Sequence, residues 1–253
     1  MKIKALLKKE LLEILRTYKI YVIPVIFLFF GLLSPITAKI MPDLLKSMAG
    51  EFKIELPPST WHDSYGQFFK NLNQIGLLAV ILTTMGTVAD EKARGTALLV
   101  LARPISRHAF ILSKWMGNIT LLIFSIASSY VACTYYTYVL FPQTNVGASL
   151  EATLLFLIYA VFISSLTIFA SSITASNIGA GGIAIAGFFV TSILPSLHKS
   201  FAKYSPGALT ALEMKIINGS ATIGSASWAI IITTILSVAL VTLGSYIFSK
   251  QEL

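Results

Sequence analysis

Long uncharged and mostly apolar runs recur along the chain, and short segments that carry the charges separate them. A helix needs about 20 apolar residues to cross a bilayer, and a charge near its centre is costly, so each run predicts one membrane-spanning helix. Six spans are predicted, at about residues 20–40, 71–89, 115–140, 152–170, 178–197 and 228–248. The predicted fold class is therefore all-α, a polytopic membrane protein whose single transmembrane domain covers residues 1–253.

Two of the predicted helix ends depend on polar turns rather than on charges. Residues 141–145, which include Pro142 and Asn145, predict the end of the third helix. The uncharged stretch 152–197 would be about 69 Å long as one helix, more than twice the thickness of a bilayer. It must therefore fold back on itself, and the small polar residues at 171–177 predict the hairpin.

The composition supports a membrane protein, with 55% hydrophobic residues, only 12% charged residues and a mean hydropathy of +0.78. Soluble domains contain about 25% charged residues. Cys133 is the single cysteine, which excludes an intrachain disulfide and a cysteine-based metal cage. In this setting the net charge of +8 reports membrane topology, so no nucleic-acid partner is expected.

The positions of lysine and arginine predict the orientation of the chain. If the N-terminus lies in the cytoplasm, 12 of the 19 basic residues fall on the inner side, which favours an N-in/C-in topology. These inner residues are Lys2, Lys4, Lys8, Lys9, Arg16, Lys19, Lys92, Arg94, Arg103, Arg107, Lys114 and Lys250.

Residues 1–19 predict an N-terminal amphipathic helix that lies on the inner membrane surface. Ile3, Leu7, Leu11, Ile14 and Tyr18 recur at spacings of three and four, and charged residues occupy the rest of the helix. The alternative interpretation is a basic segment that only sets the topology and happens to be helical.

Segments 41–70 and 198–227 lie on the outer side and are long for loops between neighbouring spans. Apolar positions such as Leu44, Leu45, Met48 and Phe52 suggest short helices at the outer rim. Such helices would form either an outer gate or a cap without a gating role.

The cytoplasmic segment 90–107 joins the second and third spans and predicts a short helix across the membrane surface. Gly95 permits a sharp change of direction, Thr96 can cap the helix, Pro104 ends it and Ser106 starts the next helix. An apolar turn flanked by arginines is costly to expose, so we expect lipid headgroups or a partner to cover it.

These features together resemble the permease subunits of ABC type-2 exporters. The resemblance rests on the basic N-terminal helix, on Lys114 at the start of the third span, and on three further stretches. These are Leu56-Pro57-Pro58-Ser59-Thr60 leading to Gln67 and Asn71-Leu72-Asn73-Gln74-Ile75, the residues from Glu91 to Thr96, and Ala102-Arg103-Pro104-Ile105-Ser106-Arg107. They cover about the first half of the chain, and topology supports the second half.

The resemblance implies that segment 90–107 contains a coupling helix that docks into a separate ATP-binding subunit. Leu98, Leu99 and Leu101 would dock and Glu91 would brace the segment, with Arg94, Gly95, Thr96, Arg103, Pro104 and Arg107 completing the coupling site. Glu91 lies within reach of Arg94 at i+3, and of the basic N-terminal helix if that helix packs nearby. It further implies two permease subunits, identical or different, and two ATPase subunits that bind ATP and Mg²⁺. We expect export across a prokaryotic plasma membrane, of a cargo that the sequence does not define.

The chain contains no Gly-x-x-x-x-Gly-Lys-Ser/Thr motif, so ATP hydrolysis is expected in the partner, and no catalytic residue, metal ligand or cofactor is expected here. Two alternatives remain. A stand-alone channel or secondary transporter would need ionisable groups or broken helices at mid-membrane, and only Pro24 and Pro35 hint at a break. An intramembrane enzyme would need a nucleophile with a base, or clustered metal ligands, and the spans offer neither.

Overall fold

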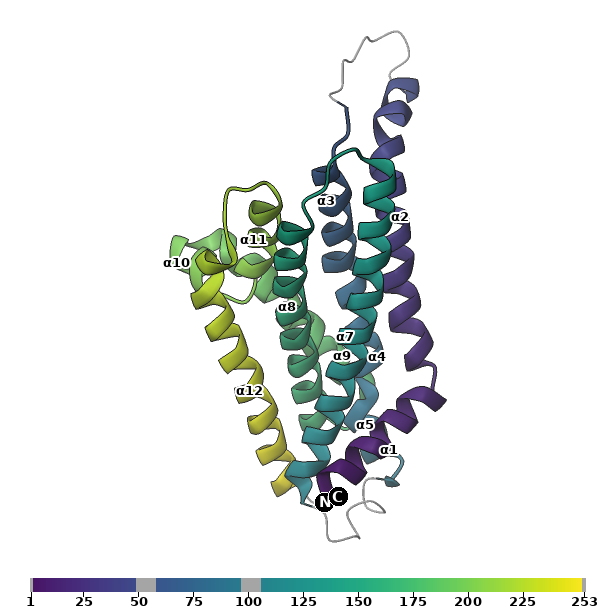
Figure 1. The fold of residues 1–253 in the computed structure, drawn as a ribbon. Coiled ribbons are helices and arrows are strands. Elements are labelled where there is room, and N and C mark those ends of the chain that lie inside the picture. Colours follow the sequence, from purple (N-terminus) through teal and green to yellow (C-terminus); the bar gives the residue numbers. More distant parts are fainter. Residues whose placement is uncertain (1, 49–57, 97–105, 252–253) are drawn as a thin grey trace.

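The structure is a computed structural model that describes residues 2–48, 58–96 and 106–251. Within these ranges all regular structure is helical, and six helical runs are long and apolar enough to cross a membrane (Figure 1). The elements are α1 (Lys2–Arg16), α2 (Lys19–Met48), α3 (Trp61–Asn71), the π-helical turn η1 (Leu72–Gly76), α4 (Leu77–Thr84), α5 (Gly86–Ala93), α7 (Arg107–Leu140), α8 (Val146–Ile173), α9 (Asn177–Leu197), α10 (Lys199–Tyr204), α11 (Ala208–Ile217), the 3-10 turn η2 (Ile223–Ala226) and α12 (Ser227–Lys250). The all-α prediction with six spans is confirmed.

The helices are longer than the spans predicted from uncharged runs. The second helical run starts at Trp61 rather than at residue 71, and the third starts at Arg107 rather than at residue 115. A prediction from uncharged runs ends each span at the first charged residue. A helix, in contrast, continues past the hydrocarbon when its long charged side chains can reach a polar environment. The fourth and sixth runs, at 146–173 and 223–250, likewise include the charged residues Glu151 and Lys250.

Both turns predicted from polar residues are present. Asn145 accepts a hydrogen bond from the backbone of Ala148 at the start of α8, at 3.1 Å. Ser176 accepts one from Gly179 at the start of α9, at 3.4 Å. The side chains that mark the turns in the sequence therefore satisfy the free N–H groups at the helix starts.

The first span is one uninterrupted helix. Pro24, Pro35 and Pro42 all lie inside α2, so the break suggested by the prolines is wrong. Leu44 and Leu45 belong to the end of α2 rather than to a separate rim helix, and Phe52 lies outside the described residues. Segment 198–227 does contain the short helices α10 and α11, as predicted for the outer rim.

The second span is segmented, in contrast to the first. It consists of α3, the π turn η1, α4 and, after a break at Met85, α5. π turns and breaks in membrane helices recur at functional sites and hinges. The span that leads into segment 90–107 therefore has two irregular points along its length.

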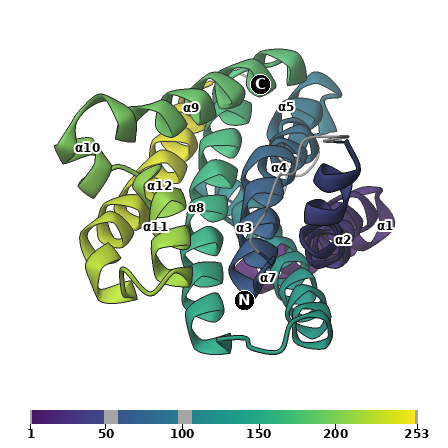
Figure 2. The same cartoon turned by 90° about the horizontal axis from the view of Figure 1, so that it is seen from above.

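Helix α8 occupies the middle of the bundle, with α4, α5, α7, α9, α11 and α12 packed around it (Figure 2). Its Phe156 packs near Phe27 of α2 and Phe69 of α3, with ring centroids 6.1 and 6.5 Å apart. Helices α2 and α7 approach closely at Gly31, where a Cβ atom would lie 2.5 Å from the carbonyl oxygen of Ser129. The aromatic contacts belong to the larger of two apolar clusters, and the smaller one includes Val88 of α5, Phe110 of α7 and Phe248 of α12.

The bundle has two distinct ends (Figure 1). One end is formed by α1, the end of α5, the start of α7, the turn between α8 and α9, and the end of α12, and is called here the coupling end. The opposite end carries α3 and α11. The predicted coupling segment thus leaves and re-enters the bundle at the end where α1 lies.

Candidate functional site

Gly95 provides the turn at which the chain leaves α5. Its φ of +69° lies in the left-handed region, which glycine adopts at little cost, and its N–H donates to the carbonyl of Lys92 at 3.1 Å. The hydroxyl of Thr96 donates back to the carbonyl of Glu91 at 3.3 Å. The sharp change of direction predicted at Gly95 is present.

Five of the predicted coupling residues, Leu98, Leu99, Leu101, Arg103 and Pro104, lie outside the described residues. The chain is described again from Ser106, whose hydroxyl accepts the N–H of Ala109 at 3.2 Å and so caps α7. The predicted helix start at Ser106 is confirmed.

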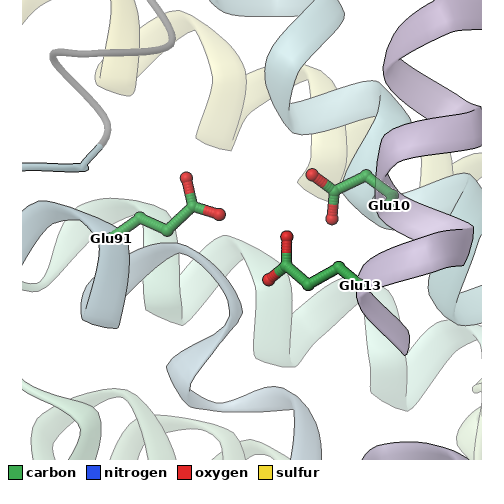
Figure 3. A group of neighbouring side chains, drawn as sticks. All are labelled: Glu10, Glu13 and Glu91. Carbon is green, nitrogen blue, oxygen red and sulfur yellow. The ribbon is translucent and has the colours of Figure 1, made fainter. Parts of the chain in front are cut away.

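Glu91 belongs to an ion-pair cluster that joins three helices. Figure 3 shows its three carboxylates, which come from Glu10 and Glu13 on α1 and from Glu91 on α5. Lys114 Nζ of α7 donates to Glu91 Oε1 at 2.6 Å and to the carboxylate of Glu10 on α1 at 3.3 Å. Lys9 Nζ of α1 lies 2.9 Å from Glu13, 3.1 Å from Glu10 and 3.4 Å from Glu91. We call these five residues the charged junction.

Lys114 is the most deeply placed member of the charged junction, with only 1% of its side chain exposed. Its ammonium also lies 5.0 Å from the ring centroid of Phe110. Removing an ammonium group from water costs several kcal/mol, and only well-placed partners offset that cost. Glu10, itself 6% exposed in its side chain, and Glu91 supply this compensation, so α1 and α5 are both attached to α7 through one buried charge.

Burial and ion pairing shift the pKa values of Lys9 and Glu13, the two more exposed members of the charged junction, in opposite directions. Burial lowers the pKa of Lys9, but the hydrogen bond to Glu13 and the charges of Glu10 and Glu91 outweigh it, so its pKa lies above the ordinary value. Burial raises the pKa of Glu13, but Lys9 and Lys114 outweigh it and leave the pKa below the ordinary value. Both groups are therefore held in their charged forms.

Among the described residues, Glu91 pairs with Lys114 and Lys9 rather than with Arg94, the partner that an i to i+3 spacing suggested. Arg94 is exposed beside a groove of about 440 Å³ that Tyr18 and Thr87 also line. Glu91 Oε2 is buried and has no hydrogen-bond partner in the described part of the chain. The predicted contact of Glu91 with the basic N-terminal helix is present.

One carboxylate oxygen from each of Glu10, Glu13 and Glu91 lies within 4.8 Å of the other two, a spacing that suits metal ligands (Figure 3). The ammonium groups of Lys9 and Lys114 already lie among these oxygens and supply the positive charge. The arrangement is that of an ion-pair cluster, and we assign no metal to it.

Helix α5 is also attached to the turn between α8 and α9. The break at Met85 leaves the N–H groups of Val88 and Ala89 without helical partners, and Ser171 Oγ accepts both, at 3.0 and 2.9 Å. Asn177, at the start of α9, donates a hydrogen bond to the side chain of Asp90 on α5.

Helices α5 and α7 also contact the end of α12. Lys92 donates to the carbonyl of Ser172 at 2.8 Å and to the side chain of Gln251 at 3.2 Å. Arg107, a predicted coupling residue, donates to the carbonyl of Gln251 at 2.6 Å, and His108 bonds Ser245 at 2.8 Å. Polar contacts thus connect both ends of segment 90–107 to the rest of the coupling end.

Sequence reasoning missed Lys9, Glu10, Glu13 and Lys114 as site residues. A signal was present, because Lys114 lies two turns inside α7 and is followed by an uncharged run, where a lone charge requires a partner. The side of α1 that faces the bundle also differs from the predicted apolar face. Leu6, Glu10 and Ile14 are buried, whereas Tyr18 is exposed.

The comparisons with known proteins point to one family. The sequence matches the family described as ABC-2 family transporter protein over residues 4–253, which is nearly the whole chain. It is also 27% identical over 208 residues to a Bacillus subtilis (strain 168) protein, the uncharacterized transmembrane protein YxlG, with 81% of each chain covered.

Removing the charge of Lys114 should destabilise the protein strongly, because Glu10 and Glu91 would remain buried near one another. We expect Lys114→Met to lower the free energy of unfolding by about 3–5 kcal/mol, measured by denaturant titration in mixed micelles. Adding Glu10→Gln should recover part of the loss, since it removes one uncompensated charge.

The matched control is Lys8→Met, on the exposed side of α1, which should change the free energy of unfolding by less than about 0.5 kcal/mol. Equal effects of the two single variants would show that Lys114 is not the charge on which the junction depends.

Proposed function

The chain belongs to the ABC-2 family of transporter proteins, and we propose that it is the permease subunit of an ABC exporter, driven through segment 90–107. Membership of this family implies association with an ATP-binding subunit. The protein is a multi-pass membrane protein with six spans. The observation that carries the proposal is the charged junction, which ties both helices flanking segment 90–107 to α1.

Position and packing support an input of force at this segment. Residues that precede it belong to α5, and residues that follow it belong to α7. A subunit that pushes on the segment therefore acts on the second and third spans together. Because Lys114 joins both to α1, the three helices move as one body rather than separately.

The segmented second span gives this body a point about which to move. The break at Met85 lies one to two turns above Glu91, and Ser171 rather than a backbone carbonyl accepts the N–H groups beyond it. Side-chain acceptors can be exchanged at lower cost than helical ones, so a bend at Met85 requires no loss of helix.

The proposed transport unit contains two permease subunits, identical or different, and two ATP-binding subunits that bind ATP and Mg²⁺. The proposed orientation places both termini and the coupling end in the cytoplasm, with α1 along the inner surface. Transport is directed outward, and Leu98, Leu99 and Leu101 insert into the groove of the ATP-binding subunit. Arg94, Arg103 and Arg107 flank this apolar turn.

A cysteine cross-link in native membranes tests the partner and the orientation together. In a Cys133→Ser background, which removes the buried native thiol, a cysteine at Leu98 should trap the ATP-binding subunit. The control is a cysteine at Ser59, two residues before α3, which lies at the opposite end of the bundle; it should trap none. Capture from Ser59 alone, or from neither site in an active protein, would contradict the proposal.

Replacement of Glu91 tests its bracing role. Glu91→Ala should reduce ATP-dependent transport about tenfold while the chain still inserts and binds its partner, since coupling free energies of about 1–3 kcal/mol are typical. Lys114 keeps Glu10 as a partner in this variant. Asp43→Ala, at an exposed carboxylate near the end of α2, should leave transport unchanged; equal loss in both variants would remove the special role of Glu91.

A further inference from the structure

Glu213 is a fully buried carboxyl group at the end of the bundle opposite the charged junction. It lies on α11 with 0% of its surface exposed, among the buried apolar residues Leu209, Ile216 and Ile217. A buried carboxylate without a cationic partner is among the most costly groups in a protein. Its presence therefore requires an explanation that packing does not provide.

The partner of Glu213 is Asn73, which comes from the π turn of the second span. Asn73 Nδ2 donates to Glu213 Oε2 at 2.7 Å. Two residues earlier, Asn71 Nδ2 donates instead to Ser34 Oγ of α2 at 3.2 Å. The second span thus presents two amides to two different neighbours, and the second of them holds α11.

Each residue of this pair has one oxygen that accepts no hydrogen bond. Glu213 Oε1 and Asn73 Oδ1 are both buried, and neither has a hydrogen-bond partner among the described residues. An amide oxygen and an ionised carboxylate oxygen are both acceptors, so neither can satisfy the other. One hydrogen on the carboxyl group supplies the missing donor, and it also removes the buried charge.

We propose that Glu213 and Asn73 form a proton-binding site that holds α11 against the π turn of the second span. In the bound state Glu213 is a carboxylic acid whose Oε1–H donates to Asn73 Oδ1, while Asn73 Nδ2 donates to Glu213 Oε2. The two hydrogen bonds close a ring between an acid and an amide. Loss of the proton breaks one of them and leaves a buried negative charge, which favours separation of α11 from the second span.

The surroundings of Glu213 favour the acid form. Burial raises the pKa of Glu213 well above its ordinary value, and the hydrogen bond from Asn73 offsets only part of this effect. Charged and titratable residues on the elements packed against α11 are Glu151 and Tyr159 of α8, His62, Asp63, Tyr65 and Lys70 of α3, Lys199, Lys203 and Tyr204 of α10, and Tyr246 and Lys250 of α12, with Lys215 on α11 itself. Within the described chain, none of these forms an ion pair with Glu213, and the Tyr159 hydroxyl bonds Thr191 at 3.2 Å.

A cavity lies next to the amide of the pair. Asn73 lines this cavity of about 350 Å³ between the second span, α8, α9 and α11, together with Tyr159 and Thr210. Phe189 and Ser192 of α9 also line it. The cavity therefore adjoins the pair on the side of Asn73, while Glu213 lies behind the amide.

The full-length protein in detergent or nanodiscs tests the site through the variant Glu213→Gln. The glutamine amide is a permanent donor to Asn73 Oδ1, so it reproduces the two hydrogen bonds of the protonated pair. At low pH, Glu213→Gln should therefore have the same unfolding midpoint as the wild type. Glu213→Leu removes both hydrogen bonds and should lower the midpoint at every pH. Wild type should show an infrared carboxylic-acid C=O band at neutral pH that is absent in Glu213→Gln.

The pH dependence follows from the direction of the shift. A carboxyl group with a raised folded-state pKa stabilises the fold fully below the unfolded pKa of about 4.3, and this contribution is lost as pH rises through the folded value. The unfolding midpoint of the wild type should therefore fall, relative to that of Glu213→Gln, as the pH rises above the unfolded pKa. A Glu213→Gln midpoint as low as that of Glu213→Leu, or no acid band in wild type, would overturn the proposal and indicate an ionised carboxylate.

Discussion

The coupling end depends on the ion pairs that the buried ammonium group of Lys114 forms with Glu10 and Glu91. One positive charge, almost wholly removed from water, has carboxylate partners on two other helices. Because such a charge is tolerated only while its partners stay in place, the ion pairs fix α1 and α5 to the start of α7 more firmly than apolar packing alone. Exposed ion pairs at the same positions would be worth little and would fix nothing.

The segmented second span connects this end to the opposite one. Glu91 attaches its lower part to α1 and α7, and Asn73 attaches its π turn to α11. Between them, Ser171 accepts the N–H groups freed by the break at Met85. The second span therefore has polar contacts to other helices on both sides of Met85. The two polar pairs act at opposite ends of the same mechanical element.

The number of spans, the turns at 141–145 and 171–177, and the glycine turn at Gly95 could be predicted because each depends on residues close in sequence. For Glu91, the sequence could indicate a contact with the basic N-terminal helix but not which lysines it pairs with. Its partners Lys9 and Lys114 are 82 and 23 positions away. Asn73 and Glu213, 140 positions apart, could not be paired by any local pattern. Polar residues inside uncharged or outer segments mark such sites, but only the packing of the helices identifies their partners.

We expect α1, α5 and the start of α7 to move as one body when ATP is bound. Spin labels at Lys8 of α1 and Ala93 of α5, both exposed, measure this directly in the assembled transporter with Cys133→Ser. The distance between these two labels should be the same with and without ATP, while a label pair across the ATP-binding subunits reports their closure. A change in the Lys8 to Ala93 distance upon that closure would show that α1 and α5 move separately.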